Sequence, residues 1–253
     1  MTDRIRVGVL GKTGRMGSLV IQTVSVAGDL EFVGATDGGL EGLSELVAAQ
    51  PQVVVDFTHP DAVMAHVEYL VQQGVSVVIG TSGVGPDRQA AIEEMLAAGP
   101  AEVAVLVIPN FALGAVLAMR FTREAAKFFR SVEIIELHHA GKADAPSGTA
   151  AATVHAVAAA RAEAGLGAIP DATTHDPAGA RGAVVDGGVH VHSIRLPGLV
   201  AHQEAILGND GELLTIRHDS IDRSSFMPGV LLAVRSALGR PGLTVGLEPL
   251  LGL

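Results

Sequence analysis

The sequence contains no cysteine and no tryptophan, and it has a single tyrosine. Without cysteine there can be no disulfide bonds, thiolate metal sites or cysteine nucleophiles. Aromatic residues make up 3% of the chain, which leaves few side chains for stacking on nucleic-acid bases. Basic residues are also scarce: 17 Lys and Arg stand against 27 Asp and Glu, and the resulting net charge of −10 argues against nucleic acid as a partner. A protein of this composition must bind anions at a locally built positive site.

Long hydrophobic runs are absent as well. No apolar run reaches the roughly 18 residues that a membrane span requires. The first residues, MTDRIRVGVLG, pass directly into a short strand-like run and lack the longer apolar core of a signal peptide. We therefore expect a cytoplasmic protein with no membrane partner. The 253 residues suffice for one large domain or two modest ones.

Short apolar segments alternate with helical patterns in the first part of the chain. The expected strands cover residues 5–10, 31–36, 53–57, 75–79 and 103–108, and the expected helices cover 16–27, 64–73 and 88–98. This alternation predicts βαβ units and a parallel sheet. The strands are apolar throughout, which is typical of strands that are covered on both faces.

The pattern changes near Asn110. Helices are expected at 115–129 and 150–164, strands at 132–137, 190–196, 201–207 and 213–218, and a loop at 166–188 that is rich in Gly, Pro, Asp and Thr. Asn209-Asp210-Gly211 is a hairpin signal, so the sheet of this half is predicted to be antiparallel or mixed.

The last segments, a helix at 230–238 and an apolar strand at 243–247, are too short to form a core of their own, and we expect them to rejoin the first sheet. The predicted fold class is α/β, with a Rossmann-like, mostly parallel sheet domain and an inserted α+β domain. The first domain is expected to comprise residues 1–110 and 219–253, and the inserted domain residues 111–218.

The motif VGVLGKTGRMG places Gly11, Gly14 and Gly17 between the first expected strand and helix. Glycines in this turn let the backbone approach a pyrophosphate at the helix N-terminus. Asp37 ends the second strand, where a carboxylate accepts hydrogen bonds from ribose hydroxyls. An ordinary βα turn with a solvated acid is the alternative, but strand, loop, helix and acid together favour a dinucleotide.

The choice of dinucleotide depends on charges around this loop. Asp37 favours NADH, because a carboxylate repels the 2′-phosphate of NADPH. Lys12 and Arg15 flank the same loop and attract that phosphate. We therefore expect use of both cofactors, with NADH at least as good.

Two later loops, Gly80-Thr81-Ser82-Gly83 and Pro109-Asn110-Phe111, also follow strands of the expected parallel sheet. Ligands bind beyond the carboxyl ends of such strands, so both loops are candidates for contact with the nicotinamide half of the cofactor. Turns chosen for Gly and Pro geometry are an equally good explanation.

The segment ELHHAGKADAPSGTA, residues 136–150, concentrates polar chemistry. Ser147 precedes a helix whose first backbone N–H groups can bind a carboxylate, although capping alone would also explain the serine. His138 and His139 close a strand, and an imidazole is a ready proton donor or acceptor. Lys142 can hold a carboxylate or act as an acid, and Asp144 can orient one of these groups or form part of the turn.

A metal site is the alternative for the histidines, which occur at 138, 139, 190, 192, 202 and 218. None forms the i, i+4 pair of a helical zinc site and cysteine is absent, so we expect no metal. His190, His192, His202 and His218 are expected to be surface or hydrogen-bonded structural residues. The residues alone thus indicate a hydride-transferring enzyme for a carboxylated small molecule, without naming the substrate.

Several motifs resemble those of the dihydrodipicolinate (4-hydroxy-tetrahydrodipicolinate) reductase family, especially its actinobacterial members. They are EIIELHHAGKADAPSGTA, VGVLGKTGRMG, VVVDFTHP, GTSG, PNFALGAV and RHDSIDRSSFMPG, and together they span the chain. The resemblance implies NAD(P)H-dependent reduction of 4-hydroxy-tetrahydrodipicolinate, a dicarboxylate, in diaminopimelate and lysine biosynthesis. It also implies a homotetramer built through the inserted sheets.

The resemblance further implies roles for individual residues. His138 and Lys142 would be catalytic, and the substrate would be held by His139, Ser147, Gly148 and Thr149. The NADH or NADPH site would comprise Gly11, Lys12, Thr13, Gly14, Arg15, Met16, Asp37, Gly80, Thr81, Ser82, Pro109, Asn110 and Phe111.

Three positions depart from the family pattern. Gly141 stands where many members have a further histidine, Gly38 where some have an arginine after the acid, and Ser82 where threonine is usual. Two other functions remain open: another nicotinamide-dependent dehydrogenase of a small dicarboxylate, or a non-catalytic NAD(P)H sensor.

Overall fold

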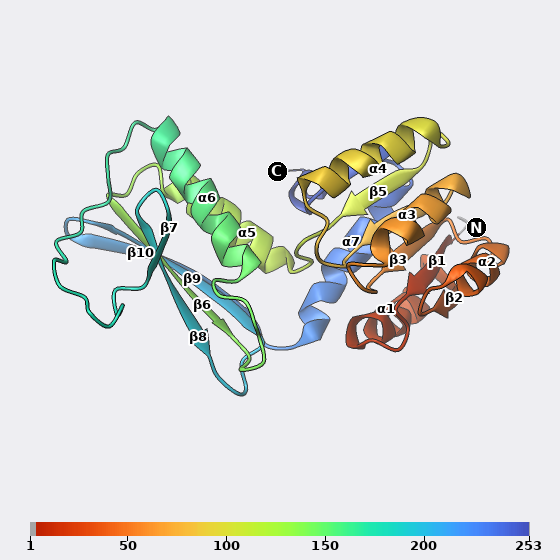
Figure 1. The fold of residues 1–253 in the computed structure, drawn as a ribbon, viewed down its shortest axis with the longest axis horizontal. Coiled ribbons are helices and arrows are strands. Elements are labelled where there is room, and N and C mark those ends of the chain that lie inside the picture. Colours follow the sequence, from red (N-terminus) through yellow and green to blue (C-terminus); the bar gives the residue numbers. More distant parts are fainter. Residues whose placement is uncertain (1–3, 253) are drawn as a thin grey trace. The chain divides into compact units, whose positions relative to one another are not determined.

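The computed structural model describes residues 4–252, which form two compact units (Figure 1). The first unit takes the chain through Leu113 and again from Ser224 onward, and the second takes Gly114–Arg223. None of the helices in the described range is long and apolar enough to cross a membrane.

A six-stranded parallel sheet forms the centre of the first unit, with strand order β11-β5-β4-β3-β1-β2. Its strands are β1 (Ile5–Leu10), β2 (Leu30–Thr36), β3 (Val53–Asp56), β4 (Ser76–Ile79), β5 (Ala104–Val107) and β11 (Gly242–Val245). The predicted Rossmann-like sheet is confirmed, and so is the return of the C-terminal strand, because β11 pairs with β5. Every residue of β3, β4 and β5 is buried, as the continuous apolar runs predict.

Helices cover both faces of this sheet. On one face α1 (Arg15–Val26) packs beside α7 (Met227–Ala237), and on the other α2 (Leu40–Ala48), α3 (Val63–Gln72) and α4 (Pro86–Ala98) pack in a row. Two short 3₁₀ helices, η1 (Arg223–Phe226) and η2 (Glu248–Leu250), flank α7 and β11. Both sides of the sheet therefore contribute to the core, and the loops at its carboxyl edge are left for ligands.

The second unit contains a five-stranded sheet of order β10-β9-β6-β8-β7. Its strands are β6 (Ser131–His138), β7 (Ala183–Asp186), β8 (Val189–Arg195), β9 (Ala201–Asn209) and β10 (Glu212–Ser220). β6 and β8 are parallel and the other pairs are antiparallel, so the sheet is mixed. The predicted hairpin is confirmed: β9 and β10 pair across Asp210 and Gly211, and Gly211 has φ of 87°.

Helices α5 (Leu113–Ala125) and α6 (Gly148–Glu163) pack on this second sheet. Alternate residues of β6 face α6, and Val132 and Ile134 form a buried cluster with Val154 and Val157. The period of two along β6 also directs Glu136 toward the start of α6.

Three details of the predicted secondary structure are wrong. No helix is predicted between residues 37 and 52, yet α2 lies there; its nine residues include Gly42 and follow two glycines, and burial of Leu43 and Leu46 stabilises it. The expected loop at 166–188 contains β7, a four-residue edge strand that pairs only with β8. The helix expected to reach Phe129 ends at Ala125.

Candidate active site

The glycine loop after β1 is a tight turn. Gly11 has φ of 87°, and a Cβ atom there would lie 2.5 Å from the carbonyl oxygen of Phe57. A Cβ atom on Gly17 would lie 2.0 Å from the carbonyl oxygen of Gly11. Both positions therefore require glycine, and they hold the start of α1 directly against the turn.

The N-terminus of α1 has the properties of an anion site. Gly14 is the N-cap and offers no side-chain cap, and the first turn contains no acidic residue. Lys12 and Arg15 are exposed beside it, and Met16 is half-buried. The first turn of α1 therefore supplies no counterion of its own to the partial positive charge of the helix end.

Asp37 lies against the same loop. Its Oδ1 accepts hydrogen bonds from the backbone N–H and the hydroxyl of Thr13, each at 2.9 Å. These two bonds, the backbone one foremost, hold the pKa of Asp37 below its usual value. The carboxylate is thus ionised, exposed and fixed beside the turn.

The loops after β4 and β5 lie at the same edge of the sheet, because Leu10, Asp56, Ile79 and Val107 are in register at the strand ends. Gly80 is half-buried there, and Ser82 and Pro109 are exposed. The structure thus brings the predicted cofactor residues of three loops to one edge.

Three predicted cofactor residues on these loops have contacts within the protein, and two of them, Thr81 and Phe111, are buried. The hydroxyl of Thr81 donates to Asp56 at 2.8 Å. Asn110 accepts a bond from the N–H of Ala112 at 2.9 Å. The Phe111 ring is buried 5.4 Å from that of Phe57. Thr81 and Phe111 therefore shape the loops from inside.

Asp56 is a buried carboxylate that the sequence analysis did not single out. It accepts bonds from the N–H and the hydroxyl of Thr58 at 2.8 and 2.6 Å and lies 2.9 Å from Nδ1 of His66. Burial alone would raise its pKa, but the hydrogen bonds from His66, Thr58 and Thr81 outweigh it and keep the pKa low. Asp56 thus ties the ends of β3 and β4 to α3.

In the second unit, the predicted helix start is confirmed. Ser147 is the N-cap of α6, and its hydroxyl accepts a hydrogen bond from the N–H of Ala150 at 3.1 Å. A Cβ atom at Gly148 would meet nothing within 4 Å, so the approach to the first turn is open. That turn contains no acidic residue, so no side chain within it offsets the partial positive charge of the helix end.

Lys142 and the two adjacent histidines precede this helix. The ammonium of Lys142 bonds both oxygens of Asp144, at 2.7 and 2.9 Å. His139 is exposed, and its carbonyl oxygen accepts the N–H of Lys142 at 3.1 Å. At Gly141 a Cβ atom would lie 3.5 Å from the His139 ring, an ordinary contact distance.

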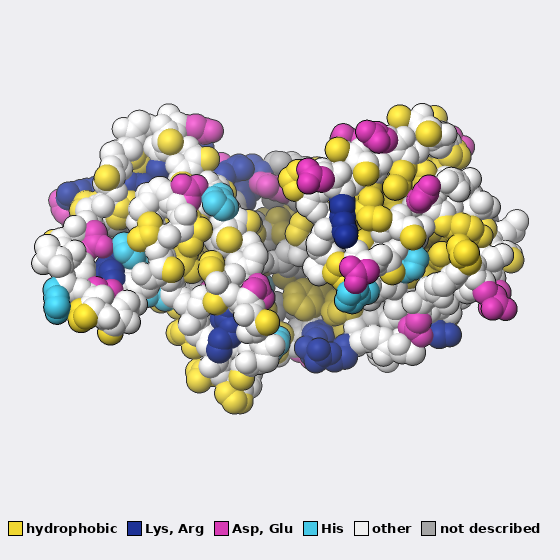
Figure 2. Space-filling view, in the orientation of Figure 1, with side chains coloured by type: hydrophobic (Ala, Val, Ile, Leu, Met, Phe, Trp, Pro, Cys, Tyr) yellow, Lys and Arg dark blue, Asp and Glu magenta, His cyan; other side chains and the backbone are white. Residues whose placement is uncertain are grey.

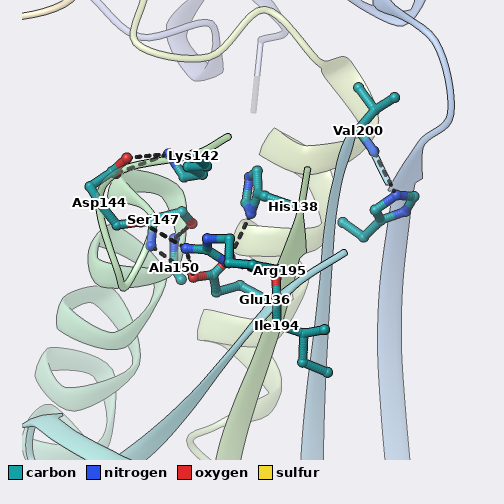
Figure 3. Close-up of polar contacts among 10 residues, drawn as sticks. Glu136, His138, Lys142, Asp144, Ser147, Ala150, Ile194, Arg195 and Val200 are labelled. Atoms are coloured by element: carbon teal, nitrogen blue, oxygen red, sulfur yellow. Dashed lines mark hydrogen bonds and ion pairs between the residues drawn. The ribbon is translucent and has the colours of Figure 1, made fainter. Parts of the chain in front are cut away.

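A fully buried carboxylate, Glu136, underlies the segment (Figure 3). Oε2 lies 2.5 Å from Nδ1 of His138, and Oε1 accepts the N–H of Ser147 at 3.2 Å. Arg195 bonds both oxygens, at 2.9 and 2.7 Å, and also donates to the carbonyl of Asp144 at 2.7 Å. Figure 3 shows His138 and Lys142 on the same side of this Glu136–Arg195 pair.

Burial and hydrogen bonding act in opposite directions on these groups. Burial alone would raise the pKa of Glu136, but hydrogen bonds from Arg195, Ser193 and His138 keep it below its usual value. Burial lowers the pKa of His138, and the Glu136 carboxylate only partly offsets this. An ionised Glu136 beside a largely neutral imidazole is the resulting state near neutral pH.

Glu136 and Arg195 were missed because they lie 59 residues apart and meet only through the β6–β8 pairing. One signal was present: Glu136 occupies the same alternating face of its strand as the buried Val132 and Ile134. A carboxylate at such a position needs partners.

Three of the other predicted structural histidines have polar partners. His192 lies 2.9 Å from Glu133, and His202 lies 2.7 Å from Asp219. His190 is buried with Nε2 3.4 Å from Asp171. Across residues 4–252 no group of three or more His, Asp or Glu side chains is arranged to hold a metal ion.

Comparison with known proteins gives matches along the whole chain. The family descriptions "Dihydrodipicolinate reductase, N-terminus" and "Dihydrodipicolinate reductase, C-terminus" match residues 5–111 and 114–251. The 4-hydroxy-tetrahydrodipicolinate reductase of Nocardia farcinica is 57% identical over 98% of this chain and 99% of its own length. That of Cutibacterium acnes is 54% identical over the same shares.

Solved structures agree. The dipicolinate-bound dihydrodipicolinate reductase from Paenisporosarcina sp. TG-14 is 35% identical, with a TM-score of 0.84 over 97% of this chain and 99% of that one. The diaminopimelate dehydrogenase of C. glutamicum, 16% identical with a TM-score of 0.54 over 98% of this chain and 94% of that one, shares the fold alone. The glycine loop, the capped helix α6 and these matches lead to one conclusion: the chain belongs to the dihydrodipicolinate reductase family.

Proposed function

We infer that this chain reduces 4-hydroxy-tetrahydrodipicolinate with NADH or NADPH in diaminopimelate and lysine biosynthesis. The observation that carries the inference is the segment from His138 to Thr149. It joins a proton-transferring imidazole, a lysine and an open, serine-capped helix start within one short stretch. Proton transfer to a carboxylated cyclic imine and binding of its carboxylates would use these three components.

The first unit fits a nicotinamide dinucleotide. The Gly11 and Gly17 contacts leave no room for Cβ atoms, so the turn is tight and α1 starts close against it. Gly14, between them, would present no side chain to an approaching pyrophosphate. The uncapped start of α1, with Lys12 and Arg15, would hold its charge, and Asp37 would accept the adenosine ribose hydroxyls. The bound reduced cofactor supplies the hydride.

The loops after β4 and β5 would border the nicotinamide end. Gly80 and Ser82 would offer mainly backbone groups there, as would Pro109, since Thr81 and Phe111 are directed into the protein. Ser82 keeps a hydroxyl at a position where family members usually have threonine.

The substrate's carboxylates would be held at the start of α6. The N–H groups of Gly148 and Thr149, the hydroxyl of Ser147 and the ring of His139 would contact them. Lys142 would add a positive charge, because its ammonium has three donors and Asp144 does not use them all. These contacts would fix the distance and face for hydride transfer.

His138 would move the proton. Its Nδ1 is engaged by Glu136, so Nε2 is the atom available to the substrate. A protonated substrate nitrogen is the better hydride acceptor, and His138 or Lys142 would supply or relay that proton.

The preference between the two cofactors is expected to be weak. Asp37 opposes a 2′-phosphate and Lys12 and Arg15 attract it, while Gly38 provides no cationic clamp. Comparable turnover with NADH and NADPH would support this balance, and strict use of NADPH would contradict it.

The proposal also covers the oligomeric state of the protein and its location in the cell. We propose a cytoplasmic homotetramer formed through the second unit's sheet, whose edge strand β10 carries Leu213 at 77% exposure. Figure 2 shows hydrophobic side chains over the loop between β8 and β9, and Leu196 in that loop is 52% exposed. Light scattering should give a mass near four times 25.8 kDa, and a monomer would refute the tetramer.

The activity is tested by following oxidation of NADH and NADPH while the upstream synthase supplies the substrate. Pyridine-2,6-dicarboxylate, a planar mimic of the substrate, should inhibit competitively, and a solved relative is described as dipicolinate-bound. Turnover of another dicarboxylate without such inhibition would favour a different dehydrogenase. Cofactor binding with no turnover of either would favour a sensor.

A further inference from the structure

Glu136 carries more contacts than a purely structural acid needs. It is 0% exposed, is the last inward-facing residue of strand β6, and bonds groups from the strand end, from β8 and from the start of α6. Each of these partners belongs to, or directly supports, the catalytic segment. The carboxylate therefore connects the proton-transferring residue to the proposed anion site.

We propose that Glu136 is a positioning residue for the reductase: it fixes the tautomer of His138 and holds that ring and the start of α6 in one arrangement. The proposal rests on the reductase function inferred above. Glu136 is not placed in contact with the substrate and acts through His138 and Ser147.

The tautomer follows from the hydrogen bond. An ionised carboxylate only accepts, so Nδ1 of His138 must carry the proton in the 2.5 Å contact. In the neutral ring, Nε2 is then a bare acceptor, and it becomes a donor only when the ring is protonated. Glu136 thereby assigns all proton exchange with the substrate to Nε2.

Arg195 keeps the Glu136 carboxylate ionised. A buried carboxylate without a cation would bind a proton or stabilise a protonated His138. The guanidinium bonds both oxygens of Glu136 and also the carbonyl of Asp144, so it neutralises the acid and anchors the loop that carries Lys142. Arg195 thus prevents Glu136 from holding His138 permanently in the charged state.

The groups that face His138 have definite effects. Burial lowers its pKa, Glu136 on β6 raises it, and Lys142 in the following loop and Arg195 on β8 lower it. Asp144 is paired with Lys142, and β9 presents the neutral Ala201 opposite His138. Removing Glu136 or Arg195 should therefore move the His138 titration in opposite directions.

The second link runs to the helix. Oε1 of Glu136 accepts the N–H of Ser147, whose hydroxyl caps α6. A shift of the Glu136 side chain would therefore move the proposed carboxylate site along with His138. If Glu136 only stabilised the fold, its replacement would change neither the titration of His138 nor substrate binding.

Glu133 provides a matched control. It lies on the same strand and the opposite face, and it also bonds a histidine and an arginine, His192 at 2.9 Å and Arg181 at 2.5 Å. Glu133→Gln removes a comparable set of ion pairs without touching His138. Its kcat and pH profile should match those of the wild type.

The experiment measures kcat, substrate KM and their pH dependence for wild type, Glu136→Gln, Arg195→Met and Glu133→Gln, with NADH binding as a check on folding. Glu136→Gln should lower kcat about tenfold or more. It should move the limb of the profile that reports His138 to lower pH by about one unit, and Arg195→Met should move it to higher pH. The pH profile should shift in these directions in each variant whether His138 donates or accepts the proton.

Unchanged kcat and profiles in Glu136→Gln and Arg195→Met, with only a lower Tm, would overturn the proposal. If these variants do not fold, the ring ¹⁵N shifts of His138 in the wild-type enzyme decide it. A proton on Nδ1 of the neutral ring is expected, and one on Nε2 would overturn the assignment. Absence of wild-type turnover would instead refute the reductase function, so the two failures are distinguishable.

Discussion

Replacement of Gly38 by arginine would give this chain the cation that some family members have after the acidic residue. The backbone at Gly38 opposes the change, because its φ is 109°. A Cβ atom there would also lie 2.8 Å from Nε2 and 3.1 Å from Cε1 of His66. That ring cannot simply turn away, since Asp56 holds its Nδ1 at 2.9 Å.

The expected cost has two parts. A non-glycine residue in the left-handed region costs roughly 1–2 kcal/mol. Displacing His66 from a buried carboxylate removes a charge-assisted hydrogen bond, which adds roughly 1.5–3 kcal/mol. The free energy of unfolding should therefore fall by roughly 2.5–5 kcal/mol. Each kcal/mol should lower Tm by about 2–4 °C in a chain of this size.

A comparison of the thermal unfolding of Gly38→Arg and Gly39→Arg isolates the second part of the cost, the displacement of His66. Gly39 also has a positive φ, 82°, but a Cβ atom there would meet nothing within 4 Å. Gly39→Arg should thus show the backbone cost alone and have the higher Tm. Adding His66→Ala to Gly38→Arg should cost less than the two single changes together. Equal Tm values for the two arginine variants would refute the reasoning.

Further predictions concern the helix start at Ser147, the buried Asp56 and the Asp37 carboxylate, which we propose binds the ribose. Ser147→Ala removes the bond from the N–H of Ala150, so it should lower stability by about 1 kcal/mol and raise the substrate KM without changing NADH binding, as calorimetry and kinetics will show. The low pKa of Asp56 contributes stability that is present above about pH 4 and is lost as pH falls further; acid unfolding of Asp56→Asn should therefore start from lower stability and depend less on pH in this range. Asp37→Ala should raise the Kd of NADH more than that of NADPH by titration calorimetry, and equal changes would contradict its assignment to the ribose.

The parallel sheet could be predicted because its strands are continuous apolar runs separated by helical patterns. The start of α6 could also be predicted, because a cap depends on neighbours within one turn: Ser147 and Ala150 are three residues apart. The glycine loop between β1 and α1 could be predicted for the same reason. Local rules therefore account for the two helix starts at which we propose anion binding.

The buried polar groups depend on distant neighbours, so local rules could not place them. Glu136 meets Arg195 across the β6–β8 pair, and Asp56 meets His66 and Thr81 only once α3 and β4 have packed. Thr81 lies in a loop that the strand pattern predicts to contact the cofactor, but nothing local indicates that its hydroxyl is directed to Asp56. Tertiary packing determines these side-chain directions.

The helix α2 and the strand β7 were missed for other reasons. Both are short. Two glycines precede α2 and Gly42 lies within it, but its other residues are mostly good helix formers and its leucines have helical spacing, so this helix was present in the pattern and overlooked. Glycines border β7 on both sides and favour a loop there, and pairing with β8 stabilises the strand.

We propose above all that His138 and Lys142, beside the start of α6, carry the proton chemistry of a reductase. The most direct test is the coupled assay with wild type, His138→Gln and Lys142→Met, alongside measurement of NADH affinity. The wild type should turn over the substrate, and kcat should fall about 100-fold or more in each variant while the affinity for NADH is retained. Wild-type turnover in both variants would contradict it.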